Sequence, residues 1–223
     1  AVAVNSATSA LHIACLALGV APGDLVWTVP ISFVASANCA LYCGADIDFV
    51  DVEEATANID PEALEDKLSE AARNGRLPKV LIPVLYSGRP HDQARIAELC
   101  NRHGVRIIED ASHAIGAIGA SGEIVGSCRW ADICVFSFHP VKIVTTAEGG
   151  AATTRDPELA ARMQEFRSHG ISRDPHRMHR PDIGGWYYEQ HALGYNYRLT
   201  HLQAGQGVSQ MQRDAGVVTR REA

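Results

Sequence analysis

Short apolar runs rich in β-branched residues alternate with amphipathic segments along most of the chain, and this alternation limits the folds open to it. The runs with the length and composition of strands are residues 1–4, 25–29, 46–50, 80–84, 105–109 and 133–136. Such runs suit strands that are covered on both faces. Two intervening segments, 62–72 and 158–167, have apolar residues at helical spacing and follow Asp-Pro pairs typical of helix starts. The pattern predicts an α/β fold, with a mainly parallel sheet and helices on both of its faces.

An aspartate and a lysine follow two of the predicted strands. Asp110 follows strand 105–109, and Lys142 follows strand 133–136 and precedes the turn Thr-Thr-Ala-Glu-Gly-Gly. Ligands of parallel sheets bind at the carboxyl ends of the strands, so we expect the two side chains near one another. A lysine amine can carry pyridoxal phosphate (PLP) as a Schiff base, while a carboxylate keeps the pyridinium nitrogen protonated. A lone lysine after a strand is usually a solvated loop residue, and its pairing with Asp110 is what predicts a PLP enzyme.

Two further segments could contribute to the same site. Residues 5–11 open a helix after the first strand, where small residues and free N–H groups favour an anion. A plain Ser/Thr helix cap explains this segment equally well. Neither Gly-x-Gly-x-x-Gly nor Gly-Lys-Ser/Thr occurs here, so a single phosphate fits better than a nucleotide. Phe33 could stack on a flat cofactor, although an ordinary core position is the stronger interpretation from physics alone.

Charge, hydropathy and cysteine content limit the partners and the location. The net charge of −6 is spread over 223 residues without a basic block, which favours a small ligand over nucleic acid. The apolar stretches are too short for a membrane span and none has a signal peptide pattern, so we expect a cytoplasmic protein. Six cysteines without a Cys-x-x-Cys pair predict reduced core residues. Four histidines share no compact spacing with cysteines or carboxylates, and we expect no metal site: His176, His179, His191 and His201.

The composition changes after Gly170. Residues 172–190 are rich in arginine, histidine and glycine without a clear period, which predicts a long functional loop. A last helix is expected to begin near Thr200. The chain has no initiator Met and ends in a charged helical stretch, as an internal fragment would. The expected divisions are a cofactor-binding core at 1–170, a loop and interface segment at 171–199, and the start of a helix leading to a further domain at 200–223.

Six motifs occur in a characteristic order. They are Ser-Ala-Thr-Ser-Ala-Leu, Pro-Ile-Ser-Phe, Glu-Asp-Ala-Ser-His, Ser-Phe-His-Pro-Val-Lys, Glu-Gly-Gly and Gly-Tyr-Asn-Tyr-Arg-Leu. With them, essentially the whole chain resembles the DegT/DnrJ/EryC1/StrS family of nucleotide-sugar aminotransferases, which are fold type I PLP enzymes. The stretches Thr-Val-Pro-Ile-Ser-Phe-Val-Ala-Ser-Ala-Asn and Thr-Thr-Ala-Glu-Gly-Gly are most similar to one branch. That branch makes UDP-4-amino-4,6-dideoxy-N-acetyl-β-L-altrosamine, a precursor of pseudaminic acid.

The resemblance implies a role for each motif in holding PLP. Lys142 would carry the cofactor as a Schiff base, and Asp110 would bond its ring nitrogen. The residues that would bind the phosphate are Ala7, Thr8 and Ser137. Phe33 would stack on the ring, and His113 would lie near its other face or its phenolic oxygen.

The resemblance also implies an assembly larger than this chain. Asn196 would reach the cofactor phosphate of a partner subunit, so a homodimer with shared sites is expected. Family members carry additional residues before the first strand and a C-terminal domain, and this chain resembles their large domain without either part.

The implied activity moves an amino group from L-glutamate through PLP to C4 of a UDP-linked 4-keto-6-deoxy amino sugar. One alternative is a PLP-dependent sugar dehydratase of the same fold, in which histidine replaces the Schiff-base lysine; Lys142 argues against it. The other alternative is an inactive truncated partner subunit. Intact Lys142 and Asp110 argue against a decayed site, whereas the missing ends favour this alternative.

Overall fold

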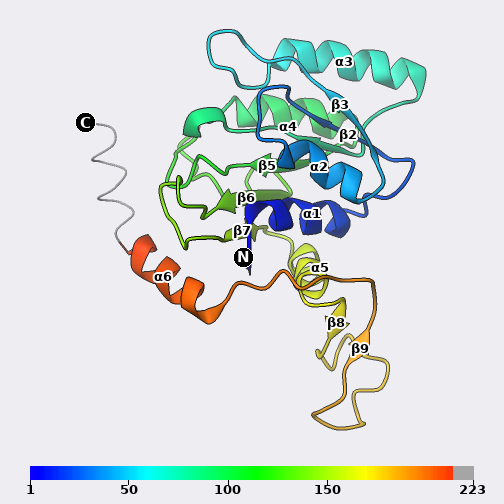
Figure 1. The fold of residues 1–223 in the computed structure, drawn as a ribbon. Coiled ribbons are helices and arrows are strands. Elements are labelled where there is room, and N and C mark those ends of the chain that lie inside the picture. Colours follow the sequence, from blue (N-terminus) through cyan, green and yellow to red (C-terminus); the bar gives the residue numbers. More distant parts are fainter. Residues whose placement is uncertain (213–223) are drawn as a thin grey trace.

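The computed structural model describes residues 1–212, which fold around one seven-stranded sheet (Figure 1). The strands of this sheet are β1 (Val2–Val4), β2 (Leu25–Thr28), β3 (Asp46–Phe49), β4 (Val80–Ile82), β5 (Arg106–Asp110), β6 (Ile133–Ser137) and β7 (Gly150–Thr153). A separate ladder is formed by β8 (Ile171–Ser172) and β9 (Glu189–Gln190). The helices are α1 (Ala7–Ala17), α2 (Ala35–Tyr42), α3 (Pro61–Asn74), α4 (Gln93–Arg102), α5 (Pro157–Arg167) and α6 (His201–Met211), with a 3₁₀ turn η1 (Tyr86–Gly88).

The strand order in the sheet is β1-β7-β6-β5-β4-β2-β3. Strands β2 to β6 pair in parallel, whereas β7 pairs antiparallel with both β6 and β1. The predicted α/β fold and the six predicted strands are therefore confirmed. Strand β7 was not predicted, because Gly-Ala-Ala-Thr carries neither the bulk nor the β-branching that signals a strand.

Helices cover both faces of the sheet (Figure 1). Helices α1, α2 and α5 bury their apolar sides against one face, and α3 and α4 pack on the other. Alternate residues of β2 supply the two cores: Val26 belongs to the first and Trp27 to the second. All six cysteines are buried and unpaired, as predicted. Among residues 1–212, no helix combines the length and apolarity that crossing a bilayer requires.

Strand β3 was predicted to be covered on both faces, and this part of the prediction is wrong. It lies at the edge of the sheet, and most of its side chains are exposed. The sequence of β3 alternates charged and apolar residues, with Asp46 and Asp48 flanking Ile47, and its charges hinder pairing with another chain at this edge.

The segment after the long loop returns to the main sheet. Tyr197 O accepts a hydrogen bond from Asn5 N at 2.8 Å, and Arg198 forms a bridge with Val4 of β1. Tyr195 N and Tyr197 N donate to backbone carbonyls at the end of α5. Thr200 then caps α6 at its predicted start, with Gln203 completing a capping box. The part of the predicted last segment beyond residue 212 lies outside the described residues.

Glycine at position 150 is required by close packing at the start of α1. Gly150 pairs with Val4 on one side and with Ser137 on the other. A Cβ atom added to Gly150 would lie 2.6 Å from Ala7 N and 2.6 Å from the carbonyl carbon of Ser6. Both neighbours are backbone atoms that cannot move independently, so the helix start rests directly on β7 because residue 150 has no side chain.

We expect Gly150→Ala to destabilise the protein by roughly 1 to 3 kcal/mol, the usual cost of overpacking. Chemical denaturation would measure the loss. Gly185→Ala is the matched control, because no atom lies within 4 Å of a Cβ added at Gly185 and its φ is not positive. An equal loss for the two variants would contradict the close approach of α1 and β7.

Candidate active site

A hollow of about 310 Å³ lies at the carboxyl ends of the central strands, beside the start of α1. It is lined by residues at or just beyond the carboxyl ends of β1, β2, β4, β5 and β6. Seven of the eight residues predicted to hold the cofactor line it: Ala7, Thr8, Phe33, Asp110, His113, Ser137 and Lys142. The fold therefore gathers these residues from segments far apart in the sequence, as the rule for parallel sheets predicts.

The start of α1 supplies one wall of this hollow. Ser6 has extended backbone geometry, and its hydroxyl accepts a hydrogen bond from Ser9 N at 3.1 Å. Ala7 and Thr8 form the first helical turn, where backbone N–H groups have no intrahelical partner. These N–H groups and the positive end of the helix dipole favour an anion. The helix cap and the anion site, left as alternatives by the sequence, are compatible in this geometry.

Asp110 ends β5, the middle strand of the sheet, and its carboxylate is buried. Its Oδ2 accepts a hydrogen bond from the hydroxyl of Ser36 at 2.7 Å, and its Oδ1 accepts one from Ser112 N at 3.1 Å. Ser36 is fully buried and lies 2.7 Å from the hydroxyl of Ser32. Because Ser36 has one proton and gives it to the carboxylate, Ser32 is the donor in that contact. The carboxylate is thus fixed from two sides.

Sequence reasoning did not identify Ser36. Phe33 was singled out in the same segment, and the serine was given no role. Helical spacing could not have found the pair, because Ser32 lies in the bend before α2 and Ser36 in the first turn of that helix.

Lys142 lies in a bend just after β6 and is half-buried. Burial lowers the pKa of its amine, and the charge of Asp110 opposes this effect only in part. Burial and the charge of Lys142 lower the pKa of His113, and the charge of Asp110 opposes this effect only in part. A lowered amine pKa increases the fraction of the neutral, nucleophilic form.

Phe33 is exposed, although it lines the hollow. Its relative exposure is 72%, and that of Val141, which lines the same hollow, is 73%. The interpretation of Phe33 as an ordinary core residue is therefore wrong. Large apolar side chains that stay exposed at the mouth of a pocket indicate a surface that a ligand or another polypeptide covers.

A second hollow, of about 730 Å³, adjoins the first. Both are lined by Ser112, His113, Val141 and Lys142, so the lysine and the histidine stand between two spaces. The second hollow has the size of a small-molecule site. Lys142 can therefore contact one group on the sheet side and another group on the outer side.

Glu109 precedes Asp110 but belongs to the core on the other face of the sheet. It is buried and accepts a hydrogen bond from Gln93 Nε2 at 2.6 Å. Burial raises the pKa of Glu109 to about 7. Because successive strand residues point to opposite faces, only Asp110 of the two carboxylates reaches the hollow.

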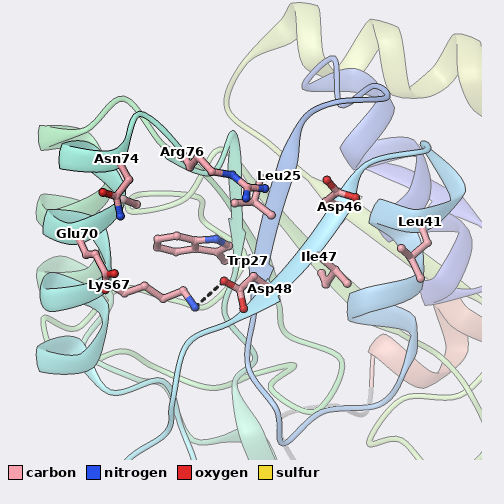
Figure 2. Close-up of a pocket in the computed structure, with 11 residues that line it drawn as sticks. Leu25, Trp27, Leu41, Asp46, Ile47, Asp48, Lys67, Glu70, Asn74 and Arg76 are labelled. Atoms are coloured by element: carbon pink, nitrogen blue, oxygen red, sulfur yellow. Dashed lines mark ion pairs between the residues drawn. The ribbon is translucent and has the colours of Figure 1, made fainter.

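A third hollow, of about 660 Å³, lies between α3 and the edge strand β3 (Figure 2). Trp27 forms its floor, and Lys67 pairs with Asp48 across it at 2.8 Å. Lys67 also lies over the Trp27 ring, 5.1 Å from its centroid. None of the predicted site residues lines this hollow. Its ion pair and cation–π contact hold the edge strand to α3, which is a structural role.

Asn196, the eighth predicted residue, does not line the hollow that contains Lys142. It is exposed and forms a backbone bridge with Ser168 at the end of α5. Its segment is thus anchored on its own chain while the side chain faces outward.

Comparisons with known proteins agree with this geometry. The fold matches solved structures of aminotransferases. The model of the DegT/DnrJ/EryC1/StrS aminotransferase family matches residues 1–223, and the chain belongs to this family, as predicted. The family's aminotransferases are PLP-dependent.

Individual relatives support the same conclusion. The chain is 40% identical over 210 residues to the UDP-4-amino-4,6-dideoxy-N-acetyl-beta-L-altrosamine transaminase of Campylobacter jejuni, covering 94% of this chain and 51% of that protein. It matches Helicobacter pylori PseC, an aminotransferase involved in the biosynthesis of pseudoaminic acid, at TM-score 0.82 and 33% identity, over 96% of this chain and 53% of the other.

A further solved structure is similar to this chain. The PLP form of the putative sugar aminotransferase Spr1654 from Streptococcus pneumoniae matches it at TM-score 0.83 and 29% identity, over 99% of this chain and 57% of the other. The chain spans about half the length of the curated relatives it matches.

Proposed function

We propose that the protein supplies the PLP-holding part of an aminotransferase that moves an amino group from L-glutamate to C4 of a UDP-linked 4-keto-6-deoxy amino sugar. The observation that carries the proposal is the buried carboxylate of Asp110, which Ser36 and Ser112 fix in the same hollow as Lys142. The sugar and the amino donor come from the family resemblance, and the similarity to the Campylobacter jejuni transaminase supports the sugar.

The residues of the hollow fit PLP in chemical type. The start of α1 at Ala7 and Thr8, with the hydroxyl of Ser137, offers donors for a phosphate. Asp110 offers an acceptor for a protonated ring nitrogen, and Lys142 offers an amine for the aldehyde. Anion donors, a buried carboxylate and an amine in a single hollow are the set that this cofactor requires.

PLP, when bound, supplies an electron sink for charge that develops on a substrate carbon. Asp110 holds the proton on the ring nitrogen, and without that proton the sink is weaker. Lys142 Nζ takes the proton from the Cα atom of the amino donor and, in the second half of the reaction, returns a proton to C4 of the sugar. The lowered pKa of Lys142 suits an amine that must act as a base.

The remaining predicted residues position the cofactor and exclude water. We assign Phe33 to stacking on the ring, since it stays exposed at the mouth of the hollow. His113 lies at the junction of the two hollows, within reach of both the cofactor and a substrate. Its lowered pKa keeps the imidazole neutral at physiological pH, so it would donate or accept a hydrogen bond without adding charge.

The test of this function is a coupled assay of the full-length protein with L-glutamate and a panel of UDP- and dTDP-linked ketosugars. The proposal expects 2-oxoglutarate release that depends on a UDP-linked 4-keto-6-deoxy amino sugar. Release of water without amino transfer would instead identify the dehydratase, and the absence of a visible cofactor band in the purified protein would identify the inactive partner subunit.

We further propose a homodimer whose sites are shared between subunits. Asn196 is exposed, and it lies outside the hollow that holds the other seven predicted residues. The exposed apolar rim at Phe33 and Val141 is a surface that a second subunit could cover.

Asp110→Asn is expected to retain some PLP and to lose about a hundredfold or more in turnover, because a neutral amide does not stabilise a protonated ring nitrogen. Steady-state transamination kinetics and the cofactor content of the variant measure this effect. Near-normal turnover would mean that Asp110 is structural.

Two variants serve as comparisons. Ser36→Ala removes the hydroxyl that fixes Asp110, so the loss should be intermediate and accompanied by weaker PLP binding. Glu109→Gln is the matched control, because it neutralises the adjacent carboxylate on the other face of β5 and should leave turnover unchanged.

The shared site is tested by subunit complementation. We mix full-length Lys142→Ala chains with full-length Asn196→Ala chains and let the subunits exchange. In a shared site, one site of the heterodimer collects both defects and the other collects neither, so activity should return. Proven heterodimers that remain inactive would show that Asn196 serves its own subunit.

A further inference from the structure

A second cluster of side chains with metal-binding chemistry lies outside the candidate active site. His179 lies in the long loop 172–190, Glu189 is in β9, and His191 follows β9. Glu189 Oε2 lies 3.0 Å from His179 Nδ1 and 3.2 Å from His191 Nε2. In the part of the chain that the structure describes, this is the one group of three such residues whose ligand atoms all lie within 4.8 Å of one another.

We propose that His179, Glu189 and His191 bind a divalent transition metal ion of the zinc class. Imidazole nitrogens and a carboxylate oxygen are common zinc ligands, with bonds of roughly 2.0 to 2.2 Å. In a tetrahedral site such bonds place neighbouring ligand atoms roughly 3.3 Å apart. The two short distances at Glu189 are close to this spacing, and the fourth position remains open to water.

The ligands come from a segment that is fixed by backbone pairing. Glu189 pairs with Ser172 in the β8–β9 ladder, and His191 N donates to Gly170 O at 2.8 Å. Glu189 and His191 are two residues apart, which places them on one side of this extended segment. The loop between β8 and β9 then brings His179 back to the same side.

The carboxylate of Glu189 is itself held in place. It accepts hydrogen bonds from His179 N and Arg180 N, each at 2.8 Å. Supporting bonds of this kind orient metal ligands.

The nearby positive charge does not prevent binding of a cation. The three proposed ligands line a shallow hollow of about 600 Å³ together with Arg177. The guanidinium of Arg177 bonds Glu158 at 2.7 Å and Glu165 at 2.9 Å. These two carboxylates neutralise it. Glu165 Oε1 also lies 3.9 Å from His191 Nδ1, on the side of the ring away from the proposed metal. At this distance the carboxylate makes no hydrogen bond to the ring, and it adds negative charge beside the cluster.

The competing interpretation is a hydrogen-bonded cluster without metal. In that case, each facing ring nitrogen carries a proton and donates it to Glu189 Oε2. A metal requires lone pairs at the same two nitrogens. We expected no metal site from the sequence, because His179 lies ten residues from Glu189 and only the fold of the loop brings them together.

A metal at this position would join the loop residue 179 to residues 189–191. It would thereby fix the end of the loop that leads to Asn196. This inference is independent of the aminotransferase proposal, since the cluster lies outside the hollow that contains Lys142.

Titration calorimetry with Zn²⁺ tests the proposal on full-length, tag-free protein that has been stripped with EDTA. We expect one ion per chain, with affinity at least tenfold weaker in His179→Ala and in His191→Ala. His176→Ala is the matched control: it removes a histidine of the same loop that is not part of the cluster, and it should bind as the wild type does.

Cobalt substitution gives a second measurement that does not depend on the variants folding. Co²⁺ bound by the wild-type protein should show the strong visible bands of a four-coordinate site. Zinc binding that is equal in the wild type and the double variant His179→Ala/His191→Ala, or a wild-type protein without these Co²⁺ bands, would overturn the proposal and leave the hydrogen-bonded cluster.

Discussion

The candidate active site depends on the hydrogen bonds that hold the buried carboxylate of Asp110. A buried ionised group is stable only when hydrogen bonds replace the water it has lost. Here, the hydroxyl of Ser36 and the backbone N–H of Ser112 occupy both carboxylate oxygens. Ser36 lies in the first turn of α2, which follows β2, and Ser112 lies in the turn after β5, so the connections after two parallel strands supply the donors together. The site is therefore a consequence of the strand order rather than of any single motif.

The pleat of β5 separates two adjacent carboxylates into different roles. Asp110 points into the hollow, whereas Glu109 points into the core beside Gln93, where burial raises its pKa to about 7. A shift of one residue in register would exchange them. The pairing of β5 with β4 and β6 fixes that register, and it therefore selects the carboxylate that faces Lys142.

Much of the fold could be predicted from the sequence because the parallel strands carry apolar β-branched runs and two helices carry Asp-Pro starts. Strand β7 could not be predicted, because Gly150 and its neighbours are small residues that form a strand only by pairing with β1 and β6. The residues of the hollow were found from their motifs, but Ser36 was missed because its role depends on a contact with Asp110, 74 residues away. The proximity of His179 and His191 to Glu189 could not be predicted for the same reason: spacing along a loop does not reveal which residues the loop brings together.

We propose that Lys142 is the amine that carries PLP, opposite Asp110 in the same hollow. Reduction of the holoenzyme with borohydride, followed by peptide mapping, tests it most directly, because the reduced cofactor stays on the lysine that held it. We expect the label on the peptide that contains Lys142, and we expect no label on that peptide in a Lys142→Ala variant. Label on Lys67 or Lys79 would contradict it.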